Sequence, residues 1–66
     1  MLDTGVVYRW RNGLGGTVRG DDGARLFLPV TECLGRLPKV GDRVIYDIAE
    51  TDRGLVAVGA RRVQAP

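Results

Sequence analysis

The sequence predicts a small all-β domain, a barrel of five short strands, and three observations support this prediction. The apolar runs are short, and none of them shows a sustained helical period. Turn signals separate the runs at even spacing, with ten glycines and three prolines among 66 residues. Closing the sheet into a barrel removes exposed strand edges, which a chain this short cannot otherwise cover.

Each strand is predicted from a run rich in β-branched, aromatic or aliphatic residues. The turns are predicted at Asn12–Gly13, Asp21–Gly23 and Thr51–Gly54, where asparagine, aspartate and glycine favour tight reversals. A connection over 31–42 follows the third strand and includes one short helical turn at Thr31–Leu34. The predicted strands are 5–11, 14–20, 24–29, 43–50 and 55–63.

The alternation of side chains along a strand assigns the two faces of the predicted sheet. In the third strand Leu26, Leu28 and Val30 share the core face, which leaves Arg25 and Phe27 pointing outward. In the second and fourth strands the predicted core residues are Val18, Val44, Tyr46 and Ile48, and the predicted outward residues are Thr17, Arg19, Arg43 and Asp47.

The first strand is harder to orient. Strict alternation sets Val6, Tyr8 and Trp10 on one face and Val7, Arg9 and Arg11 on the other. Burying the second set would bury two arginines without partners, which is costly. Alternation therefore predicts that Tyr8 and Trp10 lie in the core, although a β-bulge would shift this phase.

Composition excludes several classes of site. A single cysteine and no histidine leave no internal disulfide and no Cys/His zinc site. Cys33 is expected to be a small apolar residue rather than a reactive thiol. No nucleophile–base pair predicts an enzyme, and no cofactor is expected. Without a membrane-spanning run or a signal peptide, we expect one cytoplasmic domain over residues 1–66 that does not bind membranes.

The positive charge is carried almost entirely by arginine. The net charge is only +2, but nine of the ten basic residues are arginine and Lys39 is the single lysine. A guanidinium group offers a planar donor fork and stacks on bases, which lysine does not. A codon bias toward arginine explains the same composition equally well.

From Gly5 to Val63 the chain resembles a bacterial cold-shock domain. "GVVYRW" followed by Asn12 is similar to the family's opening G-x-V-K-W-F-N, and "LFLPVT" to its second ribonucleoprotein motif, V-F-V-H-F-S. "VGDRVIYDI" resembles G-x-x-V-x-F-x-I, and "TDRGLVAVGARRV" resembles the closing R-G-P-x-A-x-x-V. The resemblance implies an OB-fold, a five-stranded antiparallel barrel with a face that binds single-stranded RNA or DNA.

Most of the family's stacking residues are replaced. "GLGGTV", residues 13–18, stands where the family has its first ribonucleoprotein motif, K-G-F-G-F-I. The family's Trp-Phe pair falls at Arg9 and Trp10, which puts Trp10 on or beside the binding face, against the core position that alternation predicts. Phe27 and the closing-turn Arg53 retain the family's residue. The positions that lose an aromatic or histidine ring are Gly15, Thr17, Pro29 and Val30.

These observations predict a domain that binds single-stranded nucleic acid with little sequence preference, as a monomer or weak homodimer. Trp10 and Phe27 are expected to stack on bases. Arginines are expected to contact phosphates or base planes; they are Arg9, Arg11, Arg19, Arg25 and Arg53. The alternative is a degenerate OB module for protein contact or self-association, with Leu14, Val30 and Leu37 as its interface.

Overall fold

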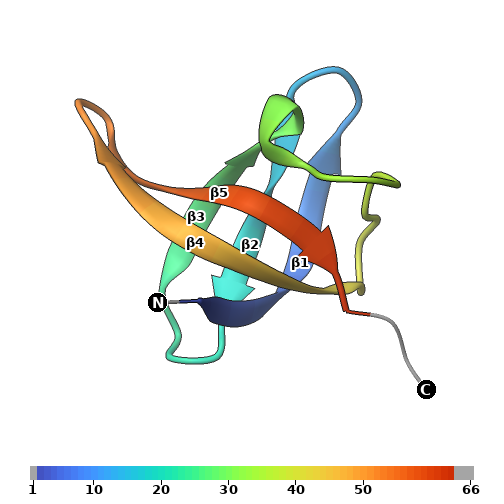
Figure 1. Ribbon diagram of the computed structural model, residues 1–66, viewed down its shortest axis with the longest axis horizontal. Coiled ribbons are helices and arrows are strands. Elements are labelled where there is room, and N and C mark those ends of the chain that lie inside the picture. Colours follow the sequence, from blue (N-terminus) through green and yellow to red (C-terminus); the bar gives the residue numbers. More distant parts are fainter. Residues whose placement is uncertain (1, 64–66) are drawn as a thin grey trace.

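The computed structural model describes residues 2–63 and shows one closed barrel with strand order β1-β2-β3-β5-β4 (Figure 1). The predicted five-stranded all-β barrel is therefore confirmed. Among the described residues, four strand pairings are antiparallel, and a parallel bridge between Phe27 and Val56 closes the barrel. The elements are β1 (Asp3–Arg11), β2 (Gly15–Gly20), β3 (Arg25–Pro29), the 3-10 turn η1 (Val30–Glu32), β4 (Arg43–Thr51) and β5 (Gly54–Arg62).

The core is small and lies inside the barrel. Trp10, Cys33 and Ile48 are half-buried and pack against it. The predicted core residues of the second, third and fourth strands are buried, except that Ile48 and Val30 are half-buried. The fully buried apolar residues are Val7, Val18, Leu26, Leu28, Val44, Tyr46, Ala57 and Ala60.

The orientation predicted for β1 is wrong at Tyr8. Val7 is fully buried and pairs with Val18, whereas Tyr8 is 37% exposed. The pairing then moves to Arg9 with Thr17, so two steps along β1 match one step along β2. Tyr8 is thus the extra residue of a β-bulge, and beyond it the strand's inward and outward positions exchange. Val7 packs inward while Arg9 remains outside.

The connections follow the predicted order with small shifts. Leu14 N–H donates to the carbonyl of Arg11 at 3.1 Å, and Gly13, at φ +83°, supplies the left-handed position of this turn. The predicted helical turn begins one residue early, at Val30, because Pro29 ends β3 in an extended conformation. The Val30 carbonyl accepts a hydrogen bond from Cys33 N–H at 3.2 Å, and the element is a 3-10 helix rather than an α-helix.

A second bulge, in β5, lies where η1 is bonded to the barrel. Ile45 pairs with Arg61 and Asp47 with Val58, so β5 carries an extra residue near Gly59, which has φ +59°. Gly59 N–H donates to the Glu32 carboxylate at 3.0 Å. This bond links η1 to β5. No helix within residues 2–63 is long and apolar enough to cross a membrane.

The bulge can be tested by truncating the two valines of β1. Val7→Ala should lower the free energy of unfolding by about 2 kcal/mol, because it removes buried methyl groups and leaves a cavity. Val6→Ala, at the half-buried neighbouring position, should cost less than about 1 kcal/mol. Urea denaturation of both variants measures the difference. A larger loss for Val6→Ala would restore strict alternation and contradict the bulge.

Candidate functional site

A shallow groove of about 440 Å³ opens on the outer face of the sheet, beside the β1–β2 turn. Four of the seven predicted site residues line it together: Arg9, Trp10, Arg11 and Phe27. The remaining lining residues are Leu14, Gly15, Gly16 and Thr17. The groove therefore combines three apolar side chains with two guanidinium groups, where β1 ends and β2 begins.

Strand register explains how residues distant in sequence meet here. Arg9 pairs with Thr17 and Thr17 pairs with Phe27, so these three residues form one row across β1, β2 and β3. Arg19 of β2 pairs with Arg25 of β3. Each lies two residues away from the first row along its strand, a distance of about 7 Å. Arg19 and Arg25 therefore share the outward face with Phe27, outside the groove itself.

Trp10 lies both at the edge of the core and on the candidate binding face, the two positions between which the sequence does not decide. It is half-buried and packs against the core cluster, and it also lines the groove. Its ring covers Gly16, since a Cβ atom added at Gly16 would lie 2.6 Å from Trp10 Cε3. Real Cβ contacts are never this short, so the indole occupies the space that a side chain at position 16 would need.

Phe27 is the most exposed aromatic ring of the groove. Its side chain is 43% exposed, and its strand neighbours are Thr17 on one side and Val56 on the other. Both neighbours are smaller than the ring, and the core side of β3 is filled by Leu26 and Leu28. Phe27 therefore presents an apolar surface to solvent from a strand that pairs with both β2 and β5.

Gly15 stands where the cold-shock motif has an aromatic residue, and the backbone at Gly15 leaves no space for a side chain. Gly15 has φ +139°, and a Cβ atom there would lie 2.1 Å from the carbonyl oxygen of Leu28. No side chain fits this backbone. Thr17 faces outward between Arg9 and Phe27, so a larger residue there would have access to the surface.

Arg53 lies apart from the groove, at the tip of the hairpin that joins β4 and β5 (Figure 1). Its N–H donates to the Thr51 hydroxyl at 3.2 Å, and that hydroxyl donates to the carbonyl of Gly54 at 2.8 Å. These bonds shape the turn and leave the exposed guanidinium in solvent. The structure does not bring Arg53 together with the groove residues.

Sequence reasoning missed one residue on this surface and gave another a different role. Leu14, predicted only as part of the alternative protein interface, is 57% exposed at the groove's edge. Tyr8, assigned to the core by alternation, emerges on the surface, where Arg25 Cζ lies 6.0 Å from the centre of its ring. The exposure of Tyr8 can be predicted only by predicting the bulge. The sequence signal for a bulge is the cost of burying Arg9 and Arg11.

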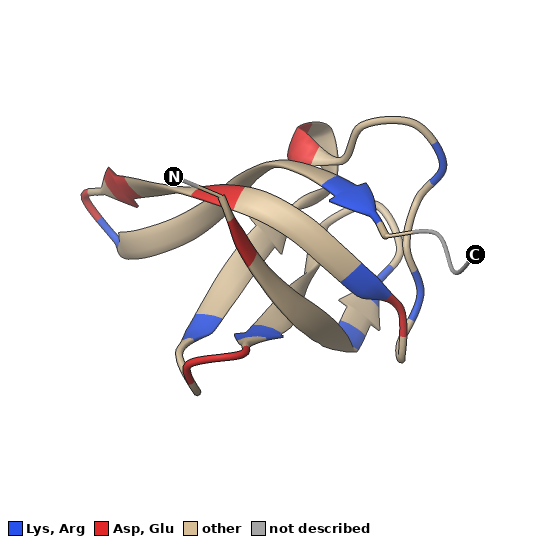
Figure 2. Cartoon of the chain, turned by 60° about the horizontal axis from the view of Figure 1, so that its bottom comes forward, with Lys and Arg blue, Asp and Glu red and all other residues tan. Residues whose placement is uncertain are grey.

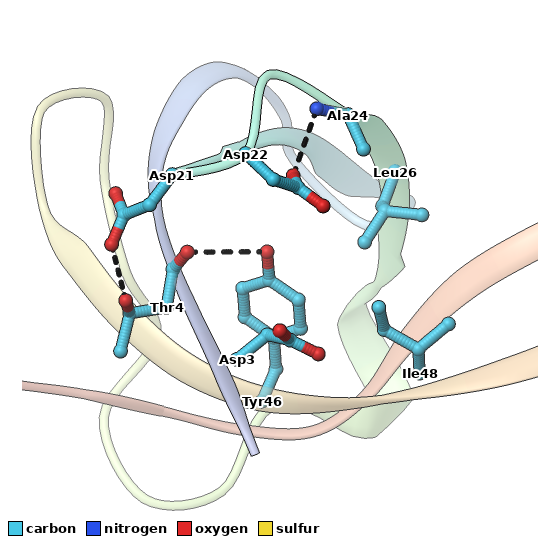
Figure 3. A pocket seen from close by; sticks show the side chains of 8 residues that line it. All are labelled: Asp3, Thr4, Asp21, Asp22, Ala24, Leu26, Tyr46 and Ile48. Atoms are coloured by element: carbon cyan, nitrogen blue, oxygen red, sulfur yellow. Dashed lines mark hydrogen bonds between the residues drawn. The ribbon is translucent and has the colours of Figure 1, made fainter. Parts of the chain in front are cut away.

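A second hollow, of about 170 Å³, is acidic (Figure 3). The hydroxyl of Thr4 donates to Asp21, and Arg43 pairs with the same carboxylate at 2.8 Å. The hydrogen bond from Thr4, and then Arg43, hold the pKa of Asp21 below its usual value. Burial is the main cause that raises the pKa of Tyr46, which lines the same hollow.

Two further acidic side chains shape turns. Asp22 accepts a hydrogen bond from Ala24 N–H at 3.0 Å, and Asp42 accepts one from Lys39 N–H at 2.9 Å. Figure 2 shows basic segments on both sides of the acidic β2–β3 turn. Within the described part of the chain, no group of three or more histidine, cysteine, aspartate or glutamate residues is arranged to hold a metal ion.

Cys33 has the environment of a structural residue. It packs against the core from the segment after η1, and its thiol donates to the carbonyl of Pro29 at 3.7 Å. Burial, followed by the nearby Glu32 carboxylate, raises the pKa of the Cys33 thiol. The reactive thiolate is thereby disfavoured at neutral pH.

No family model and no curated protein sequence matches the chain. Among solved structures, it is similar to a chain described as "drosophila Unr CSD456", with a TM-score of 0.83 and 24% sequence identity. The match covers 97% of this chain and 27% of the other, so this chain spans about a quarter of that chain's length. The likeness shows that the barrel has the cold-shock-domain OB-fold.

The contact between Trp10 and Gly16 gives a direct test of the groove's construction. Gly16→Ala should lower the free energy of unfolding by about 1–3 kcal/mol and displace the indole, because the new methyl group meets Trp10 and the Arg9 carbonyl. Tryptophan fluorescence should shift toward longer wavelength.

Thr17→Ala, at the next position, adds no atom and is the control for that substitution. It should leave the emission maximum unchanged. Unchanged stability and emission for Gly16→Ala would show that the indole does not rest on Gly16.

Proposed function

We propose that the chain binds single-stranded nucleic acid, RNA or DNA, with little sequence preference. One observation carries this proposal: Arg9, Trp10, Arg11 and Phe27 converge on a groove of a cold-shock-type barrel. Bases stack on exposed aromatic rings whatever their sequence, and guanidinium groups pair with phosphates or stack on bases. The groove supplies both kinds of contact, because Arg9 and Phe27 lie in one row across three strands and Trp10 and Arg11 follow Arg9 along β1.

The proposed affinity is modest, because few rings remain. Each base stack is worth roughly 1–3 kcal/mol, and Gly15, Thr17, Pro29 and Val30 provide no ring. Arginine contacts recover part of this loss. Every phosphate contact adds a salt dependence, with log K falling by about 0.7 per unit of log salt concentration for single strands.

In this proposal the 66 residues act as one cytoplasmic binding domain rather than as an enzyme. The domain is a monomer or weak homodimer and uses no cofactor. Arg19 and Arg25 extend the surface along β2 and β3, where their register places them on the outward face. Arg53 would contact a longer strand that reaches the β4–β5 hairpin.

Phe27→Ala tests the proposal. The dissociation constant for a fluorescent octauridine at low salt should rise roughly 5- to 150-fold, because one base stack is lost. Fluorescence anisotropy measures the binding. Leu34→Ala is the matched control, since Leu34 is also exposed, at 48%, but lies in the connection between η1 and β4 and outside the groove.

The alternative function, protein contact or self-association, is favoured by exposed apolar residues in and beyond the groove. Leu14 and Leu37 are 57% and 48% exposed, and Val30 is half-buried. Absence of oligonucleotide binding at micromolar protein, together with a stable dimer in light scattering, would replace the proposed function with this alternative.

A further inference from the structure

We propose that Tyr8 and Arg25 form a second base-binding site on the same face of the sheet. A single strand that occupies the groove would place another of its bases between the phenol ring of Tyr8 and the guanidinium of Arg25. This inference rests on the proposed function and adds a site that lies outside the groove.

The bulge creates the site by exposing a ring that alternation would bury. Tyr8 is inserted between Val7, which pairs with Val18, and Arg9, which pairs with Thr17. Its side chain is 37% exposed, and the residues on either side of it along the strand, Val7 and Arg9, are both paired with β2. A ring held at the surface of a sheet by a rigid backbone loses little freedom when a base stacks on it.

Arg25 approaches this ring from two strands away. β1 and β3 are separated by β2, so about 10 Å lie between their backbones. The Arg25 side chain crosses that distance, and its Cζ atom stops 6.0 Å from the ring centre. Direct stacking would bring the two planes to about 3.5–4 Å, and a base inserted between them needs about 7 Å. The observed 6.0 Å, measured from Cζ to the ring centre, is longer than direct stacking and about 1 Å shorter than a filled site, so the flexible Arg25 side chain has to shift by that amount to admit a base.

The energies favour a base over the arginine alone. An exposed cation–π contact contributes roughly a two- to fivefold factor in an equilibrium constant. A base stacked on an aromatic ring contributes roughly a five- to 150-fold factor. A base that enters the gap keeps a contact with the guanidinium, because guanidinium planes also stack on bases. Entry therefore replaces one weak contact with a stronger stack on the ring and a second contact on the guanidinium.

The surrounding charges favour a nucleic-acid strand that continues from the groove to this site. Arg9 follows Tyr8 directly and lines the groove, and Arg19 pairs with Arg25 in the neighbouring row. Neither Arg19 nor Arg25 forms an ion pair with any residue in the described range. Arg43 neutralises Asp21 in the adjacent turn at 2.8 Å, which reduces the repulsion of phosphates there.

The affinity test compares substitutions at Tyr8. Tyr8→Ala should raise the dissociation constant for octauridine about tenfold, and Tyr8→Phe, which keeps the ring, should stay within twofold of the original protein. Arg25→Ala should weaken binding more than Arg61→Ala, which removes the same charge from an exposed position outside both sites.

The two tyrosines provide an internal control in the unaltered protein. With tyrosine rings isotopically labelled, octauridine should move the ring proton resonances of Tyr8 upfield, as stacking requires, and leave those of Tyr46 unchanged. Tyr46 is 1% exposed and cannot stack. This measurement does not depend on the folding of any variant.

The outcomes separate this inference from the proposed function. Binding that depends on Phe27 but is unchanged by Tyr8→Ala, or a Tyr8 ring that does not respond to octauridine, would overturn the second site alone. A protein that does not bind octauridine would overturn both. Loss of affinity for both Phe27→Ala and Tyr8→Ala, with Tyr8→Phe close to the original, supports both.

Discussion

The β-bulge in β1 is the constraint on which the whole outer face depends. This strand must bury Val7 against Val18 and keep Arg9 in solvent, yet strict alternation puts both on one side. One extra residue, Tyr8, resolves the conflict, since the strand can then direct Val7 inward and Arg9 outward. Its cost is a local break in the β1–β2 ladder, which is smaller than the cost of burying an unpaired arginine.

The bulge also links Trp10 to the glycine-rich run after it. Past Tyr8 the inward positions of β1 exchange, so Trp10 turns toward the core and its ring covers Gly16. Glycine at position 16 leaves room for the indole, and Gly15 allows the chain to approach β3 closely. Of the two positions that lose a ring in the compared motif, Gly15 is closed by the Leu28 carbonyl, whereas Thr17 faces the surface, so only the glycine at position 16 is tied to the placement of Trp10.

The sequence predicted most where alternation is regular. In β3 and β4 alternation predicts inward positions for four residues that are indeed buried, because a regular ladder has period two: Leu26, Leu28, Val44 and Tyr46. The prediction from alternation is wrong at Tyr8, because a bulge depends on which residue of the neighbouring strand each residue pairs with. The family resemblance indicated the face, and register then brought Phe27 to the same groove as the β1 arginines. The Tyr8–Arg25 contact spans two strands, and no local pattern encodes it.

The balance of contacts on this face determines what kind of binding it could support. Stacking tolerates any base, and a guanidinium group contacts any phosphate, so neither contact reads sequence strongly. The Asp21 and Asp22 carboxylates of the β2–β3 turn repel phosphates near Arg19 and Arg25. Thr4 and Arg43 engage the Asp21 carboxylate, which limits that repulsion. If the face binds nucleic acid as proposed, its many arginines and few rings would give weak, salt-sensitive and unselective contact rather than tight recognition, because the electrostatic part is screened and the stacking part is small.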